Sequence, residues 1–413
     1  MFVLTPFDLL VNAQEPVEIE FWYGLGSEAG AKMEELIQEF NESQTEVKVV
    51  GVSQADYSET MQKVQAGMAA KKVPGAFIGG RDTLLNFHES NALADMTPLI
   101  EGSEILKTED FIETFLEQGQ VEGKQYAIPS YGTTQVMYFN TQIFEKAGVD
   151  PDEAFASWEN LAEASKKIKE SGAADFGHMI MWGSDNLIDM ALSNGGSYLS
   201  EDGKTVAVNS PEWVEAWDFA RQMIHDDKVM GVISGGQGWD YWYKTIDAVM
   251  NGQAGSYTGS SGDKGNLDFS YIDSRVQPGM NGNDPKPSAG ALQIMIPAQN
   301  DEAQQKAAFK WIEFFTSPEV SGRWSSFVGY IPVRKSTMEE GDYAKQVEEN
   351  PYLAIPYTQA LEAAPAFDDP TNGVMADELS KAADKVELEN VPAQEALDEA
   401  AKKIQEALDK TQN

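Results

Sequence analysis

The segment between residues 17 and 80 constrains the fold most, because strand and helix patterns alternate along it. Its first strand pattern places apolar residues at every second position, which is typical of a strand with one buried face. Helical spacing then follows Ser27, a residue that can cap a helix. Such a βαβαβ order predicts a parallel, doubly wound α/β sheet. The predicted order is strand 17–21, helix 27–40, strand 47–50, helix from about 57 to 68, and strand 76–78.

Ligands of open α/β sheets bind where the strands end, at their carboxyl edge. Three segments should meet at that edge: residues 22–27, the start of the second helix, and residues 79–82. Their glycines allow backbone N–H groups to approach a ligand. The candidate ligand contacts from this part of the chain are Trp22, Tyr57, Arg81 and Asp82.

The rest of the chain mixes both element types without a fixed-period repeat or a low-complexity linker, which predicts intertwined lobes. Its last 75 or so residues read as charge-rich helices. Strands are predicted at 126–129, 135–139 and 289–296, and helices at 158–170, 211–226, 239–251 and 301–316.

Residues 1–14 are largely apolar and end in Val11-Asn12-Ala13, which resembles the small-residue end of a secretory signal. Asp8 interrupts them, and no basic residue precedes them. Three interpretations stay open: a degenerate export signal, a first strand, or a cloning scar. We favour a signal remnant or scar and begin the folded part near Glu15.

Composition excludes several classes of partner and chemistry. The 413 residues include 30 Lys+Arg and 67 Asp+Glu, a net charge of −37 that disfavours nucleic acid and anionic membranes. The chain has no Cys, so disulfides, thiolate nucleophiles and Cys-based zinc sites are excluded. No apolar run approaches the length of a membrane span.

Catalytic and cofactor signatures are absent or weak. The three His are far apart in the sequence, and we predict no metal, no cofactor and no catalytic residue. Residues 24–29 fit a relaxed dinucleotide fingerprint, but the second strand lacks the acidic residue that would bind a ribose. Carboxylates are so abundant that a glycosidase-like pair carries almost no information.

Aromatic residues give a better indication of ligand chemistry. Residues 239–243 hold four aromatic side chains beside the glycine-rich 235–238, and Trp182 precedes Gly183. Sugars stack on such rings while nearby polar groups bind their hydroxyls. For Trp182, Trp239 and Trp242 the sequence does not decide between a position facing the ligand and a position in the core. Amphipathic helices assign four others to the core: Trp158, Trp213, Trp217 and Trp311.

Several segments together resemble the extracellular solute-binding proteins of carbohydrate ABC importers, family 1, especially the sn-glycerol-3-phosphate-binding group. The resemblance spans about 17–340 and implies a two-lobed, periplasmic-binding-protein-like α/β fold, with a doubly wound sheet in each lobe. It also implies an interlobe cleft that closes on ligand, and no enzymatic activity. The segments are FWYGLGSEAG, LIQEFNESQ, ADYSETMQ, QYAIPSYGTTQVMYFNTQIFEKAGVDP, MNGQAGSYTGSSG and FVGYIPVRKS.

The resemblance also implies lobe boundaries and ligand contacts. It places the N-terminal lobe at 15–126 plus 288–332 and the C-terminal lobe at 127–287 plus 333–413. The crossing strands that act as hinges are expected near 126–131 and 286–290. The implied contacts are Tyr57, Thr133 (or Gly132), Trp182, Ser260 or Ser261, Gly290 and Tyr330.

Two departures bear on the ligand. Arg81 stands where the glycerol-3-phosphate group has an acidic residue, and Asp377 aligns with its phosphate-pairing arginine. Because a guanidinium is the usual phosphate partner, we expect a neutral sugar or oligosaccharide. sn-Glycerol-3-phosphate or a glycerophosphodiester, a glycoside-active enzyme and a structural surface protein stay as alternatives.

The resemblance implies a working place outside the cytoplasm. The expected partners are a carbohydrate and the permease subunits, with no nucleic acid, and the chain is expected to be a monomer. A lipid-anchored member would need an N-terminal Cys, so the protein is either freely secreted or has a replaced N-terminus.

Overall fold

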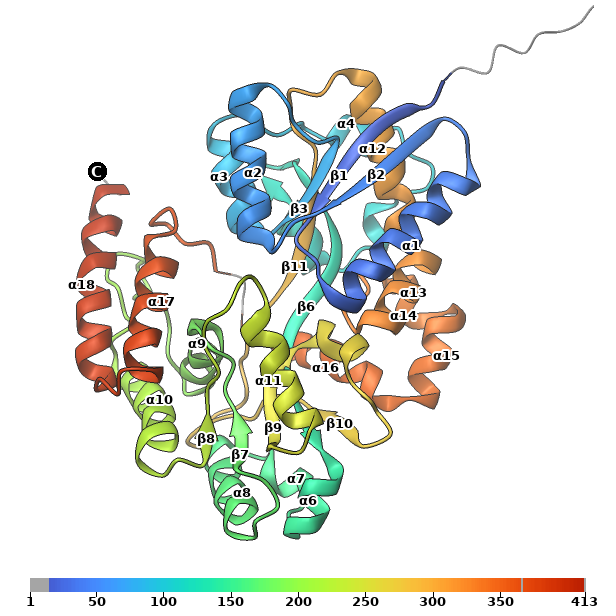
Figure 1. The fold of residues 1–413 in the computed structure, drawn as a ribbon. Coiled ribbons are helices and arrows are strands. Elements are labelled where there is room, and N and C mark those ends of the chain that lie inside the picture. The colour runs from blue at the N-terminus through green and yellow to red at the C-terminus, as the bar shows by residue number, and fades with distance from the viewer. Residues whose placement is uncertain (1–14, 365–366, 412–413) are drawn as a thin grey trace, which may run out of the picture.

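A computed structural model of the protein describes residues 15–411 except 365 and 366. The predicted leader at 1–14 lies outside the described residues. The chain forms two α/β lobes joined by long strands that run from one lobe into the other (Figure 1). The predicted fold class is confirmed.

The first lobe begins with the predicted βαβαβ unit. Strands β1, β2 and β3 are parallel in the order β2-β1-β3, and helices α1 and α2 are the crossovers. α1 buries a helical stripe of apolar side chains against this sheet, which is what its spacing predicts. The elements are β1 Val17–Tyr23, α1 Ser27–Ser43, β2 Val47–Ser53, α2 Tyr57–Ala70, β3 Ala76–Gly79, α3 Arg81–Glu89, α4 Thr97–Glu101, η1 Thr108–Asp110, α5 Glu113–Glu117, β4 Gln120–Val121 and β5 Lys124–Gln125.

The start of α1 differs from the expectation that Ser27 caps it. Gly26 is the residue before the helix, and no side chain caps the first turn. Ser27 has a positive φ of 49°, and its hydroxyl donates to Asn266 Oδ1 at 2.8 Å, in the second lobe. A contact between the lobes therefore takes the place of the cap.

One long strand, β6, belongs to both lobes. Residues 127–134 of β6 pair with β11 in the first lobe, and residues 135–139 pair with β9 in the second. The sequence predicts two separate strands here, which is wrong because Gly132 continues the ladder by pairing with Ala291. The sheet thus runs without a break in the order β2-β1-β3-β11-β6-β9-β7-β8. The bounds of the two strands are β6 Ala127–Asn140 and β11 Ala289–Met295.

The second lobe surrounds the other half of this sheet. β9 and β8 run parallel to β7, while β10 pairs with the free edge of β6. Its elements are α6 Thr141–Ala147, α7 Pro151–Ala154, α8 Trp158–Glu170, β7 Phe176–Met179, α9 Ser184–Ser193, α10 Pro211–Arg221, η2 Gln222–Asp226, β8 Met230–Gly231, α11 Asp240–Met250, β9 Ala254–Ser260, η3 Ser261–Asn266 and β10 Ile272–Arg275.

The helices from α12 to the end of the chain pack on elements of both lobes. α12 packs on β1, α14 and α15 contact α13, and α16 contacts β6 near the crossing. α17 and α18 form a pair that packs on α9 and α10 of the second lobe, along its outer side in Figure 1. The predicted lobe boundaries stay a prediction. The bounds are α12 Glu302–Phe315, α13 Pro318–Val328, α14 Lys335–Glu339, α15 Gly341–Glu349, η4 Pro351–Ala354, α16 Ile355–Glu362, α17 Val374–Glu387 and α18 Ala393–Thr411.

Each lobe has its own hydrophobic core. Trp311 lies in the core of the first lobe against Phe21 and Phe40, while Trp158 lies in the core of the second lobe. All four tryptophans assigned to the core from sequence are fully buried, which confirms that prediction. Among the helices described here, none is both long and apolar enough to cross a membrane.

Candidate ligand-binding cleft

A cavity of about 840 Å³ lies between the lobes, within the range of roughly 300–1,000 Å³ typical of small-molecule sites. Both lobes contribute to its lining. The lining comes from the β1–α1 loop, the start of α2, the middle of β6, the loop into α9, residues 239–243, the end of β9, the start of β11, Tyr330 and Ser380 of α17.

One end of the cavity is an aromatic wall made by both lobes. Tyr57, at the start of α2, lies edge-on to Trp239 of the second lobe, with ring centroids 6.3 Å apart. The Tyr57 hydroxyl is 3.0 Å from that of Tyr131, whose ring stacks on Tyr330 at 4.5 Å. Burial raises the pKa of all three tyrosines well above the usual value, so they stay neutral.

Close backbone packing fixes Tyr57 in this wall. Gly24 in the β1–α1 loop lies so near the start of α2 that a Cβ there would be 2.2 Å from the carbonyl carbon of Asp56. The Asp56 side chain caps α2 by accepting from Glu59 N at 2.7 Å. The glycine and the cap together set the position from which Tyr57 enters the cleft.

The opposite end of the cavity is formed by Trp182 and its neighbours. The Trp182 ring meets Tyr241 edge to face, with centroids 5.0 Å apart. Its Nε1 donates to Asp384 Oδ1 at 2.7 Å, and the next amide, Gly183 N, donates to Glu387 Oε2 at 3.0 Å. Helix α17 therefore positions this wall from outside the cleft.

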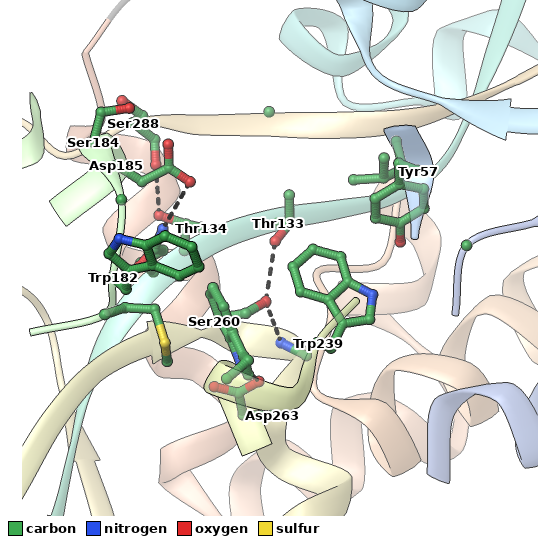
Figure 2. Close-up of a pocket in the computed structure, with 18 of the residues that line it drawn as sticks. Tyr57, Thr133, Thr134, Trp182, Ser184, Asp185, Trp239, Ser260, Asp263 and Ser288 are labelled. Carbon is green, nitrogen blue, oxygen red and sulfur yellow. Dashed lines mark hydrogen bonds between the residues drawn. The ribbon is translucent and has the colours of Figure 1, made fainter. Parts of the chain in front are cut away.

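Between the two ends, hydroxyl groups and a buried carboxylate line the cavity (Figure 2). Thr133 Oγ1 of β6 is 3.4 Å from Ser260 Oγ of β9, and Gly262 N donates to the same serine oxygen at 3.0 Å. Asp263 accepts from Trp242 Nε1 at 2.7 Å and from the Tyr257 hydroxyl at 3.1 Å. Burial raises the pKa of Asp263 to about 7.

A hydrogen-bond network holds the two crossing segments together beside the cavity. Asp189 of α9 accepts from Ser288 N at 2.8 Å and from Gln277 Nε2 at 2.7 Å. Thr134 of β6 donates from Oγ1 to Ser288 O at 2.8 Å. Burial raises the pKa of Asp189 to about 7. Ser288 thus links β6 to α9 where the chain passes between the lobes.

The lining carries carboxylates and no cation. Asp185, Asp189 and Asp263 line the cavity, whereas no Lys, Arg or His is found among the described residues of its wall. Asp185 is exposed to the cleft, yet desolvation by the surrounding protein raises its pKa. An anionic ligand would have no opposite charge to pair with here.

Seven of the eleven residues predicted to contact a ligand line this cavity. Trp242, left open between ligand and core, lines it as well. The seven are Tyr57, Thr133, Trp182, Trp239, Ser260, Gly290 and Tyr330.

Trp22 and Ser261 lie outside the lining. Trp22 points to the opposite face of β1 from Phe21 and Tyr23, packs beside Phe77, and donates from Nε1 to Glu20. Ser261 is fully buried and is not among the residues that line the cavity. The period-two alternation of β1 already places the Trp22 side chain on the face opposite Phe21 and Tyr23.

The two charged candidates after β3 also lie outside the lining. Arg81 forms a bidentate ion pair with Asp368, and its Nη1 donates to the backbone oxygens of Gln118 and Gln120. Asp82 is exposed in the first turn of α3. Arg81 therefore has its hydrogen bonds satisfied away from the cleft.

Several lining residues were not singled out from the sequence. Tyr241 and Tyr243 belong to the aromatic run 239–243, whose density was the available signal. Ser184 and Asp185 lie two and three residues after Trp182, so a search for polar neighbours of that tryptophan would have found them. Ser380 lines the cavity on α17, whereas the aligned Asp377 is exposed and does not.

Two lobes around a cleft with a wall from each lobe define the class of substrate-binding proteins. The chain belongs to the family of bacterial extracellular solute-binding proteins, whose family model matches residues 35–354. It is therefore a substrate-binding protein of ABC importers that works outside the cytoplasm and delivers small ligands to a permease. This family membership removes the alternatives of an enzyme and of a structural surface protein.

Individual proteins that this chain resembles differ in the ligand that their names or complexes give. The sn-glycerol-3-phosphate-binding periplasmic protein UgpB of Agrobacterium fabrum is 25% identical over 385 residues, covering 87% of this chain and 84% of that protein. UgpB from Mycobacterium tuberculosis in complex with glycerophosphocholine has a TM-score of 0.85 at 22% identity, covering 97% and 100% of the two chains. The GacH receptor of Streptomyces glaucescens, solved unliganded and with acarbose, has a TM-score of 0.83 at 18% identity, covering 96% and 99%.

Proposed function

We propose that this protein captures a carbohydrate in the interlobe cleft and delivers it to the permease of an ABC importer. The observation that carries the proposal is the lining: aromatic rings at both ends, hydroxyls between them, and no cation among the described wall residues. Aromatic rings pack on the apolar faces of sugars, and hydroxyls and carboxylates bind sugar hydroxyls.

The charge distribution favours a carbohydrate over a phosphate ester. A glycerol phosphate would place its anionic group among Asp185, Asp189 and Asp263 in a chain of net charge −37. The Arg81 guanidinium, which could pair with a phosphate, is bound to Asp368 instead. sn-Glycerol-3-phosphate or a glycerophosphodiester is the second candidate, because the curated relatives are named for the former.

Hinge closure is the proposed mechanism of capture. The lobes would rotate about β6 and residues 286–290, where Thr134 and Ser288 already join the crossing segments. Trp239 of the second lobe already meets Tyr57 of the first lobe edge-on, and closure would bring the Trp182 end of the cleft toward the first lobe. One chain supplies both walls of the cleft, so we propose that the protein acts as a monomer.

Tyr57→Ala is expected to weaken saccharide binding about tenfold while leaving the melting temperature close to that of the wild type. Tyr57 is half-buried at the edge of the first-lobe core, and its ring also lines the cleft, so its loss removes a proposed ligand contact at a small cost in packing. Calorimetric titration with the neutral oligosaccharide that the wild type binds best measures the change.

Tyr126→Ala is the matched control for this variant. Tyr126 lies in the same lobe, away from the cavity, with its ring against His88. Its removal is expected to leave the affinity unchanged. Equal affinity of Tyr57→Ala and wild type would show that the ligand binds elsewhere.

A further inference from the structure

Asp185 is the carboxylate in the cleft that is free to bind a ligand. The other two carboxylates of the wall, Asp189 and Asp263, each use both oxygens to accept hydrogen bonds from the protein. Asp185 accepts one long hydrogen bond on Oδ2, from Gln135 Nε2 at 3.4 Å, and its other oxygen accepts none from the described residues.

Further acidic side chains lie near Asp185, on the far side of Trp182. Asp384 and Glu387 lie behind Trp182, where they hold its ring and the following amide. Glu387 is only 2% exposed, and its Oε1 has no hydrogen-bond partner in the described structure. Burial raises the pKa of Glu387 well above its usual value, and the charges of Asp384 and Asp185 raise it further. Burial therefore keeps Glu387 largely protonated, and among the described residues no Lys, Arg or His lines the cleft beside Asp185.

Carboxylates already lie at the N-terminus of α9, next to the Trp182 end of the cleft. α9 begins at Ser184, and the partial positive charge of a helix N-terminus ordinarily attracts an anion. Here Asp185 stands in the first turn, and Glu387 accepts the hydrogen bond of Gly183 N just before it. An incoming anion would meet these two side chains, so the helix offers no free anion site.

Aromatic rings complete this end of the cleft. Figure 2 shows Trp182 and Asp185 together at one end of the pocket, facing the open space that separates them from Tyr57 and Trp239. Tyr241 stands edge-on to Trp182. A carboxylate beside the faces of aromatic rings is an arrangement that attracts an ammonium group, by Coulomb and cation–π interactions together.

We propose that the end of the cleft formed by Trp182, Ser184, Asp185 and Tyr241 binds a positively charged group of the ligand. This inference rests on the proposed function, and within it the carbohydrate carries an ammonium group near Asp185. The rest of the cleft would bind the uncharged part of the same molecule through the hydroxyls of Thr133 and Ser260.

The test compares two small probes of the same shape, choline and its uncharged analogue 3,3-dimethylbutan-1-ol. Tryptophan fluorescence or ligand-observed NMR is followed at 150 mM salt, where distant surface charges are largely screened. The wild type is expected to bind choline about tenfold more tightly than the alcohol. Asp185→Asn should abolish this preference, and Asp185→Glu, which keeps the charge, should retain it.

Asp82→Asn is the matched control, because Asp82 also stands in the first turn of a helix but outside the cavity. It is expected to keep the full preference for choline. Absence of a preference in the wild type, or a preference that survives Asp185→Asn, would overturn the inference.

The outcome also separates this inference from the proposed function. Saccharide binding without any preference for choline would overturn the inference and keep the carbohydrate function. A preference for choline that depends on Asp185, in a protein that binds no saccharide, would support the cation site and remove the carbohydrate function.

Discussion

Replacing Trp182 and Trp239 together by alanine is expected to lower saccharide affinity about 100-fold. The two rings line the two ends of the cleft, and both come from the second lobe. Each aromatic contact contributes about 1.5 kcal/mol, so losing both costs about 3 kcal/mol of binding free energy. Calorimetry on the double variant measures the loss, and circular dichroism checks that the fold is kept.

Trp22→Ala is the control that matches this variant in chemistry. Trp22 is half-buried in the first lobe, on the face of β1 away from the cavity. Its removal should leave saccharide affinity unchanged. A loss of affinity in Trp22→Ala, with none in the double variant, would move the binding site to the other face of β1.

Acid is expected to destabilise the protein through His178. This side chain is fully buried, with Nδ1 2.9 Å from Ser256 Oγ and Nε2 3.1 Å from Thr258 Oγ1. Trp158 packs edge-on against its ring. Burial lowers the pKa of His178 to about 3, so the folded protein keeps the imidazole neutral through most of the acid range.

The sign of the effect follows from proton binding. Below a pH of about 6.5 the unfolded chain protonates this histidine, whereas the folded protein does not until about pH 3. The stability contribution is therefore complete above pH 6.5 and is lost as the pH falls toward 3. The loss amounts to roughly 4 to 5 kcal/mol in the free energy of unfolding.

Two buried carboxylates have the opposite effect on the pH dependence of stability, since they make the folded protein more stable as the pH falls. The raised pKa values of Asp189 and Asp263, both about 7, make the folded protein bind protons that the unfolded chain releases. Their contribution to stability is largest below about pH 4 and falls as the pH rises toward 7. The histidine effect must therefore be isolated by comparing variants.

His178→Gln provides that comparison. Urea unfolding of wild type and variant between pH 4 and 7 should give a wild-type stability that falls more steeply with acid than that of the variant. The difference in slope, rather than the difference at one pH, is the quantity predicted. Parallel curves for the two proteins would contradict the role of His178.

The first lobe was the most predictable part of the fold. Period-two alternation in β1 and helical spacing in α1 each bury one face, so local pattern and tertiary packing agree. β6 was predicted as two strands because Gly132 and Thr133 interrupt its apolar pattern. Only the pairing with β11 and β9, which comes from distant sequence, shows that the strand is continuous.

The cleft was partly predictable. The resemblance placed Tyr57, Thr133 and Tyr330 in segments that do line the cavity. The support of Trp182 by Asp384 could not be predicted, because the two residues are 202 positions apart and meet only through the packing of α17 against α9. Arg81 pairs with Asp368 for a similar reason, through a segment that follows α16.

The central claim, that the cleft takes a saccharide rather than a phosphate ester, is tested most directly by titrating the wild type. Neutral and amino-substituted oligosaccharides and sn-glycerol-3-phosphate would be compared by calorimetry in one buffer. We predict saturable one-to-one binding of a saccharide and no detectable heat with sn-glycerol-3-phosphate. Tight binding of sn-glycerol-3-phosphate, with no saccharide bound, would contradict the claim.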